Sequence, residues 1–146
     1  MTDVARQRLH HAIITEFRAN SGRVAQFADR DLLLLTTIGA RTGTQRTWPL
    51  AYIRRGDDLV VFAANGGRPN RPGWYFNLVA NPTATIEVGT ESRPVRATVA
   101  TGDTRTQIWT GIVESSPAVA ETIAQFQSQV PWEIPLITLT RSAGSL

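Results

Sequence analysis

Residues 31–64 read DLLLLTTIGARTGTQRTWPLAYIRRGDDLVVFAA, and this stretch decides the fold. Four consecutive leucines without polar alternation are typical of a buried strand, which we predict over residues 31–37. A second strand is predicted from Trp48 to Arg54, where the two faces alternate. Gly56-Asp57-Asp58 forms a hairpin turn, and residues 59–64 return as a third strand. Three strands joined only by turns favour antiparallel pairing.

The segment before these strands predicts an amphipathic helix within residues 1–20. Its apolar residues recur at helical spacing and form one stripe: Leu9, Ala12, Ile13 and Phe17. One interpretation is a helix that covers the sheet. The other is a peripheral membrane contact, because a helix with arginines on its polar side can lie on anionic lipid.

The segments after residue 64 alternate between short helices and strands. We expect a helix from Pro72 to near Asn81-Pro82, strands over 84–88 and 95–99, a helix capped by Asp103, a helix from Pro117 to about Gln129, and a strand over 134–140. The resulting order, α-βββ-α-ββ-αα-β, lacks the regular βαβ repeat of a doubly wound fold. It predicts a single α+β domain over 1–146, built on a small antiparallel barrel or curled sheet.

Composition excludes several classes of protein. The 146 residues contain no cysteine, so disulfides, cysteine nucleophiles and thiolate metal sites are excluded. All 15 basic residues are arginine and the net charge is only +3, whereas nucleic-acid binders carry a denser basic stripe. The N-terminus lacks the apolar core of a signal peptide, and no apolar stretch is long enough to span a bilayer. We therefore expect a cytoplasmic protein, with membrane association through the first helix as the alternative.

Familiar catalytic motifs are also missing from the sequence. Both histidines are neighbours in the first helix and no Gly-x-Ser-x-Gly elbow exists, which argues against a serine triad. Without lysine there is no Walker A motif, and no spacing of His, Asp or Glu resembles a metal site. If the protein is an enzyme, a cofactor is expected to supply the reactive chemistry.

Two glycine-rich segments predict a site for a phosphate-bearing cofactor. Residues 39–50 place Arg41 and Arg46 around a glycine-bounded turn, where backbone N–H groups can converge on an anion and arginine supplies a forked charge. Residues 65–67, Asn-Gly-Gly, and residues 72–78, Pro-Gly-Trp-Tyr-Phe-Asn-Leu, follow the next hairpin. These segments would form the two walls of the site.

In this order, the motifs resemble the deazaflavin-dependent nitroreductase and quinone reductase family. The resemblance rests on LLLTTIGARTG (33–43), RTWPL (46–50), Gly-Gly (66–67), Trp-Tyr (74–75), Asn-Leu (77–78) and Asn-Pro (81–82), and it extends from about Phe17 to Leu139. It implies a split β-barrel of about six strands with flanking helices. It also implies hydride transfer from reduced coenzyme F-420, an 8-hydroxy-5-deazaflavin, to a quinone, an activated alkene or a nitroaromatic.

The resemblance assigns the cofactor site residue by residue. Arg41 and Arg46 match the positions at the cofactor phosphate and acidic tail, and residues 63–65 match the strand end and loop whose backbone meets the ring. The full set is Ala40, Arg41, Thr42, Arg46, Thr47, Pro49, Leu50, Ala63, Ala64, Asn65, Gly73, Trp74, Tyr75 and Asn77. Trp74 has a second interpretation, as an anchor of the hydrophobic core. No metal is expected.

The acceptor side stays more open. Where some family members bring tyrosines, the helix after Pro117 offers Val119, Ile123 and Phe126, which predicts an apolar acceptor pocket. The proton donor could be Tyr75, Tyr52, a serine or solvent, and Tyr75 is the candidate catalytic residue. A non-catalytic F-420 carrier and an FMN-binding barrel remain alternatives, and homo-oligomerisation is left undecided.

Overall fold

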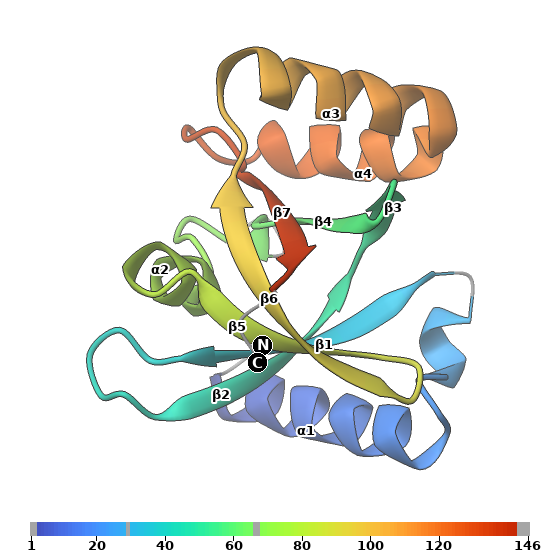
Figure 1. The fold of residues 1–146 in the computed structure, drawn as a ribbon, viewed down its shortest axis with the longest axis vertical. Coiled ribbons are helices and arrows are strands. Elements are labelled where there is room, and N and C mark those ends of the chain that lie inside the picture. Colours follow the sequence, from blue (N-terminus) through green and yellow to red (C-terminus); the bar gives the residue numbers. More distant parts are fainter. Residues whose placement is uncertain (1–2, 29, 66–67, 143–146) are drawn as a thin grey trace.

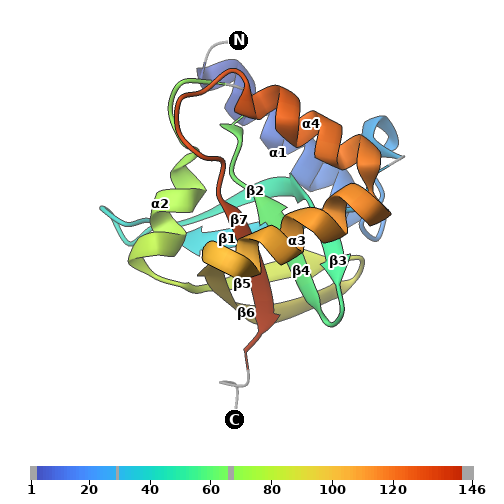
Figure 2. The same ribbon diagram turned by 90° about the horizontal axis from the view of Figure 1, so that it is seen from above.

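The computed structural model describes residues 3–28, 30–65 and 68–142. Its elements in chain order are α1 (Asp3–Ala19), the 3-10 turn η1 (Ala25–Phe27), β1 (Leu32–Ile38), β2 (Gln45–Ala51), β3 (Ile53–Arg55), β4 (Asp58–Phe62), α2 (Gly73–Ala80), β5 (Thr83–Val88), β6 (Glu91–Val99), α3 (Gly102–Ser115), α4 (Pro117–Gln127) and β7 (Leu136–Arg141). Within this part of the chain, seven strands form one curled antiparallel sheet in the order β2-β1-β5-β6-β7-β4-β3 (Figures 1 and 2). The predicted α+β class with a barrel-like antiparallel sheet is confirmed.

The sheet curls because one residue joins its two edges. Strands β2 and β3 lie at opposite ends of the strand order, yet only Tyr52 separates them in the sequence. The Tyr52 N–H donates to the carbonyl oxygen of Asp31 at 3.1 Å, which holds the bend beside the start of β1. The single strand predicted over residues 48–54 is therefore wrong. Side chains alternate between the two faces through the bend, so the sequence pattern does not reveal it. Because of the bend, the described residues form seven strands and not about six.

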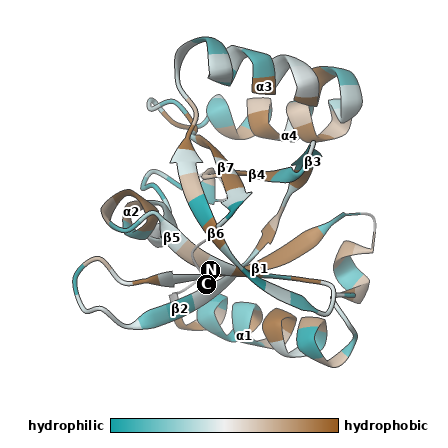
Figure 3. Cartoon of the chain, viewed as in Figure 1, coloured by the Kyte–Doolittle hydropathy of each residue, from teal (hydrophilic) through white to brown (hydrophobic). Residues whose placement is uncertain are grey.

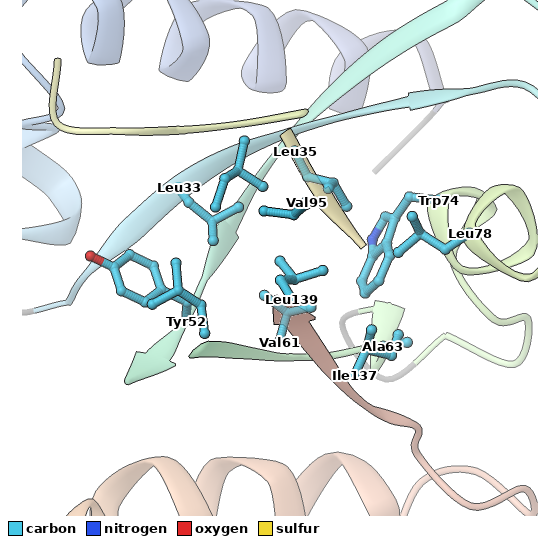
Figure 4. Close-up of a cluster of buried hydrophobic side chains, with 12 residues drawn as sticks. Leu33, Leu35, Tyr52, Val61, Ala63, Trp74, Leu78, Val95, Ile137 and Leu139 are labelled. Atoms are coloured by element: carbon cyan, nitrogen blue, oxygen red, sulfur yellow. The ribbon is translucent and has the colours of Figure 1, made fainter. Parts of the chain in front are cut away.

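Strand β1 is buried on both faces, which explains its run of leucines. Leu33 and Leu35 point into the curled sheet, where they pack with Trp74 of α2 and with strand residues such as Ile137 (Figure 4). Leu34 points to the opposite face and packs under α1. Figure 3 shows the leucine part of β1 in the hydrophobic colour, whereas the helices carry both hydrophobic and hydrophilic residues. A strand covered on both faces reads as an unbroken apolar run.

Helix α1 covers one side of the sheet (Figure 1). Ile13 and Phe17, at 5% and 1% exposure, pack against Leu34. Arg18 adds a forked ion pair to Glu87, with Nε and one terminal nitrogen 3.0 and 2.8 Å from its two carboxylate oxygens. Two residues of the predicted apolar stripe, Ile13 and Phe17, are thus buried in the fold, whereas Leu9 and Ala12 are exposed. In the described ranges, no helix combines the length and hydrophobicity needed to cross a membrane.

Helices α3 and α4 pack together over the other end of the sheet (Figure 1). Ile108, Ile112 and Ile123 join Val60 and Leu136 in one buried cluster. Helices α2 and α4 begin at prolines as predicted, with Pro72 at the N-cap and Pro117 in the first turn.

The N-terminal boundary of α3 differs from the prediction. The N-cap is Thr101, so Asp103 lies in the first turn, where a carboxylate still complements the helix dipole. Threonine and aspartate are both good caps, which leaves this boundary ambiguous in the sequence.

Candidate active site

A groove of about 900 Å³ runs between the N-terminal half of α1, strand β2, the segment from β4 to α2, and the end of α4. Half of the predicted cofactor-binding residues line it: Arg46, Pro49, Leu50, Ala64, Asn65, Gly73 and Trp74. The others do not line it: Ala40, Arg41, Thr42, Thr47, Ala63, Tyr75 and Asn77. The two predicted walls therefore do face one groove. The Gly66-Gly67 pair lies outside the described residues.

The sequence prediction missed several lining residues. They are Arg6, Gln7, Leu9 and His10 of α1, Trp48 and Ala51 of β2, and Phe62, Arg68 and Pro72. Trp48, Ala51 and Pro72 lie within or beside the predicted segments. The α1 residues come from a part of the chain far from those segments, and no local motif connects the two.

Three backbone donors of the turn between β1 and β2 already have protein partners. Gly39 N–H donates to the Thr44 carbonyl oxygen at 2.8 Å, Gly43 N–H to that of Gly39 at 3.0 Å, and Ala40 N–H to the Asn77 side chain of α2 at 3.0 Å. These three N–H groups are therefore not free to converge on an anion.

Arg46 is the arginine of this wall that reaches the groove. It lies in β2 opposite Thr37, and its side chain is exposed. Its guanidinium carbon lies 5.4 Å from the centre of the Trp48 ring, an aromatic contact that supports the side chain and leaves the charge open to solvent. Arg41, at the hairpin tip, does not line the groove.

Asn77 and Thr47 serve the framework of the site. The Asn77 amide accepts from Ala40 N–H and donates to the Thr37 hydroxyl, both at 3.0 Å, which ties α2 to the start of the turn. The Thr47 and Thr36 hydroxyls lie 2.8 Å apart across β1 and β2. Both predicted cofactor residues therefore have protein partners. Their hydrogen bonds hold β1, β2 and α2 together beside the groove.

The loop before α2 forms the opposite wall and is held by aromatic and polar contacts. Asn65 has a left-handed backbone (φ 50°), and its side chain donates to the Asn70 carbonyl at 2.6 Å. Trp132 donates to the Pro69 carbonyl at 3.0 Å. The Arg71 guanidinium lies 4.8 Å from the Trp132 ring centre and 5.9 Å from that of Tyr75. These contacts fix the loop against the segment between α4 and β7.

The groove is positively charged. Arg6, Arg46, Arg68 and His10 line it, and no carboxylate does among the residues that the structure describes. Burial lowers the pKa of His10 below its usual value, and the charge of Arg46 lowers it further. A cluster of cationic side chains lining one groove favours an anionic ligand.

The comparison with known proteins identifies the family. Residues 6–141 match the family model described as F420H(2)-dependent quinone reductase. The chain belongs to this family. An F420H(2)-dependent quinone reductase of Mycobacterium tuberculosis is 39% identical over 139 residues, which cover 92% of this chain and 89% of the relative. The quinone reductase branch of the predicted resemblance is thus the one supported, and coenzyme F-420 rather than FMN is the cofactor of the family.

Solved structures agree with this assignment. An F420-H2 dependent reductase is 32% identical with a TM-score of 0.63, covering 75% of this chain and 94% of that one. A protein solved as a domain-swapped dimer is 30% identical with a TM-score of 0.65, covering 94% of this chain and 97% of that one. The heme storage protein HutZ of Vibrio cholerae, at 18% identity and a TM-score of 0.57, shares the fold.

The groove of this F-420-dependent reductase fits its cofactor in size and chemistry. A volume of about 900 Å³ lies within the range of cofactor sites. Aromatic side chains, including Trp48, Trp74 and Phe62, line it beside the arginines, as a flat ring with an acidic extension requires.

Neither tyrosine of this reductase lines the groove. Tyr75 packs against the hydrophobic core and the edge of Phe76, with ring centres 5.4 Å apart. Tyr52 is 8% exposed and lines a separate cavity of about 590 Å³ near η1. Its hydroxyl lies 3.4 Å from a terminal nitrogen of Arg54. The two tyrosines named as proton donors from the sequence therefore lie outside the groove.

The helix expected to form the acceptor pocket contributes one residue to the groove. Phe126 lines it, whereas Ile123 is 3% exposed and packs in the α3–α4 cluster, with Val119 beside it. The prediction that all three residues face the acceptor is thus wrong for Val119 and Ile123. Helical spacing places residues on one face but does not say which face meets a ligand.

Proposed function

We propose that the groove binds reduced coenzyme F-420 and that the protein reduces a quinone by hydride transfer. The observation that carries the proposal is a groove that combines three arginines and no described carboxylate with aromatic walls, in a chain of this family. When bound, the reduced deazaflavin supplies the hydride. The protein supplies binding, orientation and exclusion of water.

Arg46 holds the phosphate in this proposal, because it is the exposed guanidinium of β2 that lines the groove. Ala64 and Gly73 leave room for a flat ring at the opposite wall, and Trp74 is fixed beside them by the core. A planar cofactor held between rigid elements meets its acceptor in a defined orientation, which lowers the entropic part of the barrier.

The acceptor in this proposal lies against the apolar side of the groove. Leu9, Phe62 and Phe126 supply that side from three separate elements. A quinone is flat and largely apolar, so these side chains can bury it and exclude water. Conversion to the quinol needs one hydride and one proton, and we assign the proton to solvent because neither tyrosine reaches the groove.

Acceptor preference tests the proposed reaction. With reduced F-420 as donor, we expect kcat/KM to be highest for quinones, then hydrophobic enones, and lowest for compact nitroaromatics. Phe126→Ala should lower kcat/KM for quinones about tenfold or more, because burial of a phenylalanine side chain contributes roughly 1.5–3 kcal/mol. Phe76→Ala is the matched control, because Phe76 is half exposed on α2 and does not line the groove. This variant should leave kcat/KM for quinones unchanged.

Two results would contradict this assignment. A clear preference for nitroaromatics would show that the apolar residues of the groove do not select quinones. Tight F-420 binding without turnover of any acceptor would favour the carrier alternative.

A further inference from the structure

One face of α1 changes from basic to apolar along its length. Arg6, His10, Ile13 and Phe17 follow the spacing of a single helical stripe. The C-terminal half of that stripe packs on Leu34, and the N-terminal half lines the groove. The buried half anchors the helix, so the basic half is held in place over the site. Helix α1 is therefore a wall of the groove as well as a cover of the sheet.

His10 shares the groove with arginine side chains, and Arg46 is the one whose charge acts on it. The charged groups that line the groove with it are Arg6 from α1, Arg46 from β2 and Arg68 from the loop before α2. Helix α4 brings the uncharged Phe126. Burial lowers the pKa of His10, and repulsion from Arg46 lowers it further, which favours the neutral imidazole in the free protein.

We propose that Arg6 and His10 belong to the anion-binding part of the cofactor site, and that His10 takes up a proton from solvent when the phosphate-bearing end of F-420 binds beside Arg46. The inference rests on the function proposed above and adds a pH dependence to that site. No electrons move in this step. The proton returns to solvent when the cofactor leaves.

The physical reason is a change in the charge that His10 faces. A bound anion offsets the charge of Arg46 and attracts the imidazolium form, so the pKa of His10 rises in the complex. Binding and protonation are then linked: each unit by which this pKa rises corresponds to a tenfold gain in affinity for the protonated protein. Affinity should be greatest at low pH and should fall as the pH rises through the pKa of His10 in the complex.

Proton NMR of the imidazole groups tests this directly in the unmodified protein. The chain has only two histidines, so two sets of signals are expected. We expect His10 to titrate at higher pH in the complex with oxidised F-420 than in the free protein. The neighbouring His11, which is exposed and does not line the groove, provides the reference signal.

Affinity measurements add matched variants. Between pH 5.5 and 8, the Kd for oxidised F-420 should rise about three- to tenfold more in the wild type than in His10→Gln. His10→Arg keeps a positive charge throughout and should lack this extra dependence while binding tightly. His11→Gln should behave as the wild type. Any ionisation of the cofactor itself is common to all four proteins and cancels in the comparison.

The outcomes separate this proposal from the proposed function. If F-420 binds and His10 titrates at the same pH with and without it, the proton uptake is wrong while the cofactor assignment stands. If F-420 does not bind at all, both are wrong. Should His10→Gln fail to fold, the NMR titration of the wild type still decides.

Discussion

Replacement of Arg46 by alanine is expected to weaken F-420 binding by about ten- to a hundredfold. A hydrogen bond to a charged group contributes roughly 1.5–3 kcal/mol, and about 1.4 kcal/mol corresponds to tenfold in Kd. The thermal stability of the free protein should change little, because Arg46 is exposed and its guanidinium lies over the Trp48 ring at the surface. Fluorescence titration and thermal melts of the same samples measure both quantities.

Arg54 provides the matched control for this variant. Its guanidinium also lies over an aromatic ring, 5.6 Å from the centre of Tyr52, but it belongs to β3 and does not line the groove. Arg54→Ala should leave F-420 affinity nearly unchanged. Arg46→Lys should recover only part of the affinity, because lysine keeps the charge but loses the forked geometry. Equal losses in the Arg46 and Arg54 variants would indicate general electrostatics and refute the phosphate assignment.

Truncation of Trp74 is expected to cost the most stability. Its side chain is 3% exposed and packs inside the curled sheet (Figure 4). Loss of a buried tryptophan side chain costs about 3–5 kcal/mol, because contacts are lost and a cavity remains. For a chain of this size, Trp74→Ala should lower the melting temperature by about 10–15 °C.

Phe76 lies two residues further along the same helix and is 50% exposed. Phe76→Ala should change the free energy of unfolding by no more than about 0.5 kcal/mol. Trp74→Phe should retain most of the stability but weaken cofactor binding, since Trp74 also lines the groove. If Trp74→Ala left the melting temperature unchanged, its placement in the core would be wrong.

The antiparallel framework could be predicted from the sequence because its signals are local. The leucine run of β1 and the hairpin at Gly56 follow from residue type and spacing. The bend at Tyr52 did not show, because side chains alternate on both sides of it. What fixes the bend is pairing of β2 with β1 and of β3 with β4, and both partners lie outside the segment itself.

Likewise, the sequence indicated those parts of the candidate site that carry local signals and not those that depend on contacts between distant segments. Arg46, Asn65 and Trp74 lie in segments whose glycines, prolines and charges already suggest a cofactor. His10 lines the groove because Ile13 and Phe17 anchor α1 against Leu34, which is a contact between segments distant in the sequence. Asn77 lies in a matching motif, but its amide is engaged by Thr37 and Ala40, a contact that the sequence does not show.

In the proposed function, this groove binds a deazaflavin with an acidic extension. Equilibrium titration of the free protein with F-420 and with FMN, followed by tryptophan fluorescence, tests it most directly, since Trp48 and Trp74 line the groove. FMN presents one phosphate, whereas the acidic tail of F-420 can also engage Arg6, which lines the same groove. We therefore expect F-420 to bind at least about tenfold more tightly than FMN, equivalent to one additional charge-assisted hydrogen bond. Equal or tighter binding of FMN would show that the groove does not select a deazaflavin with an acidic extension.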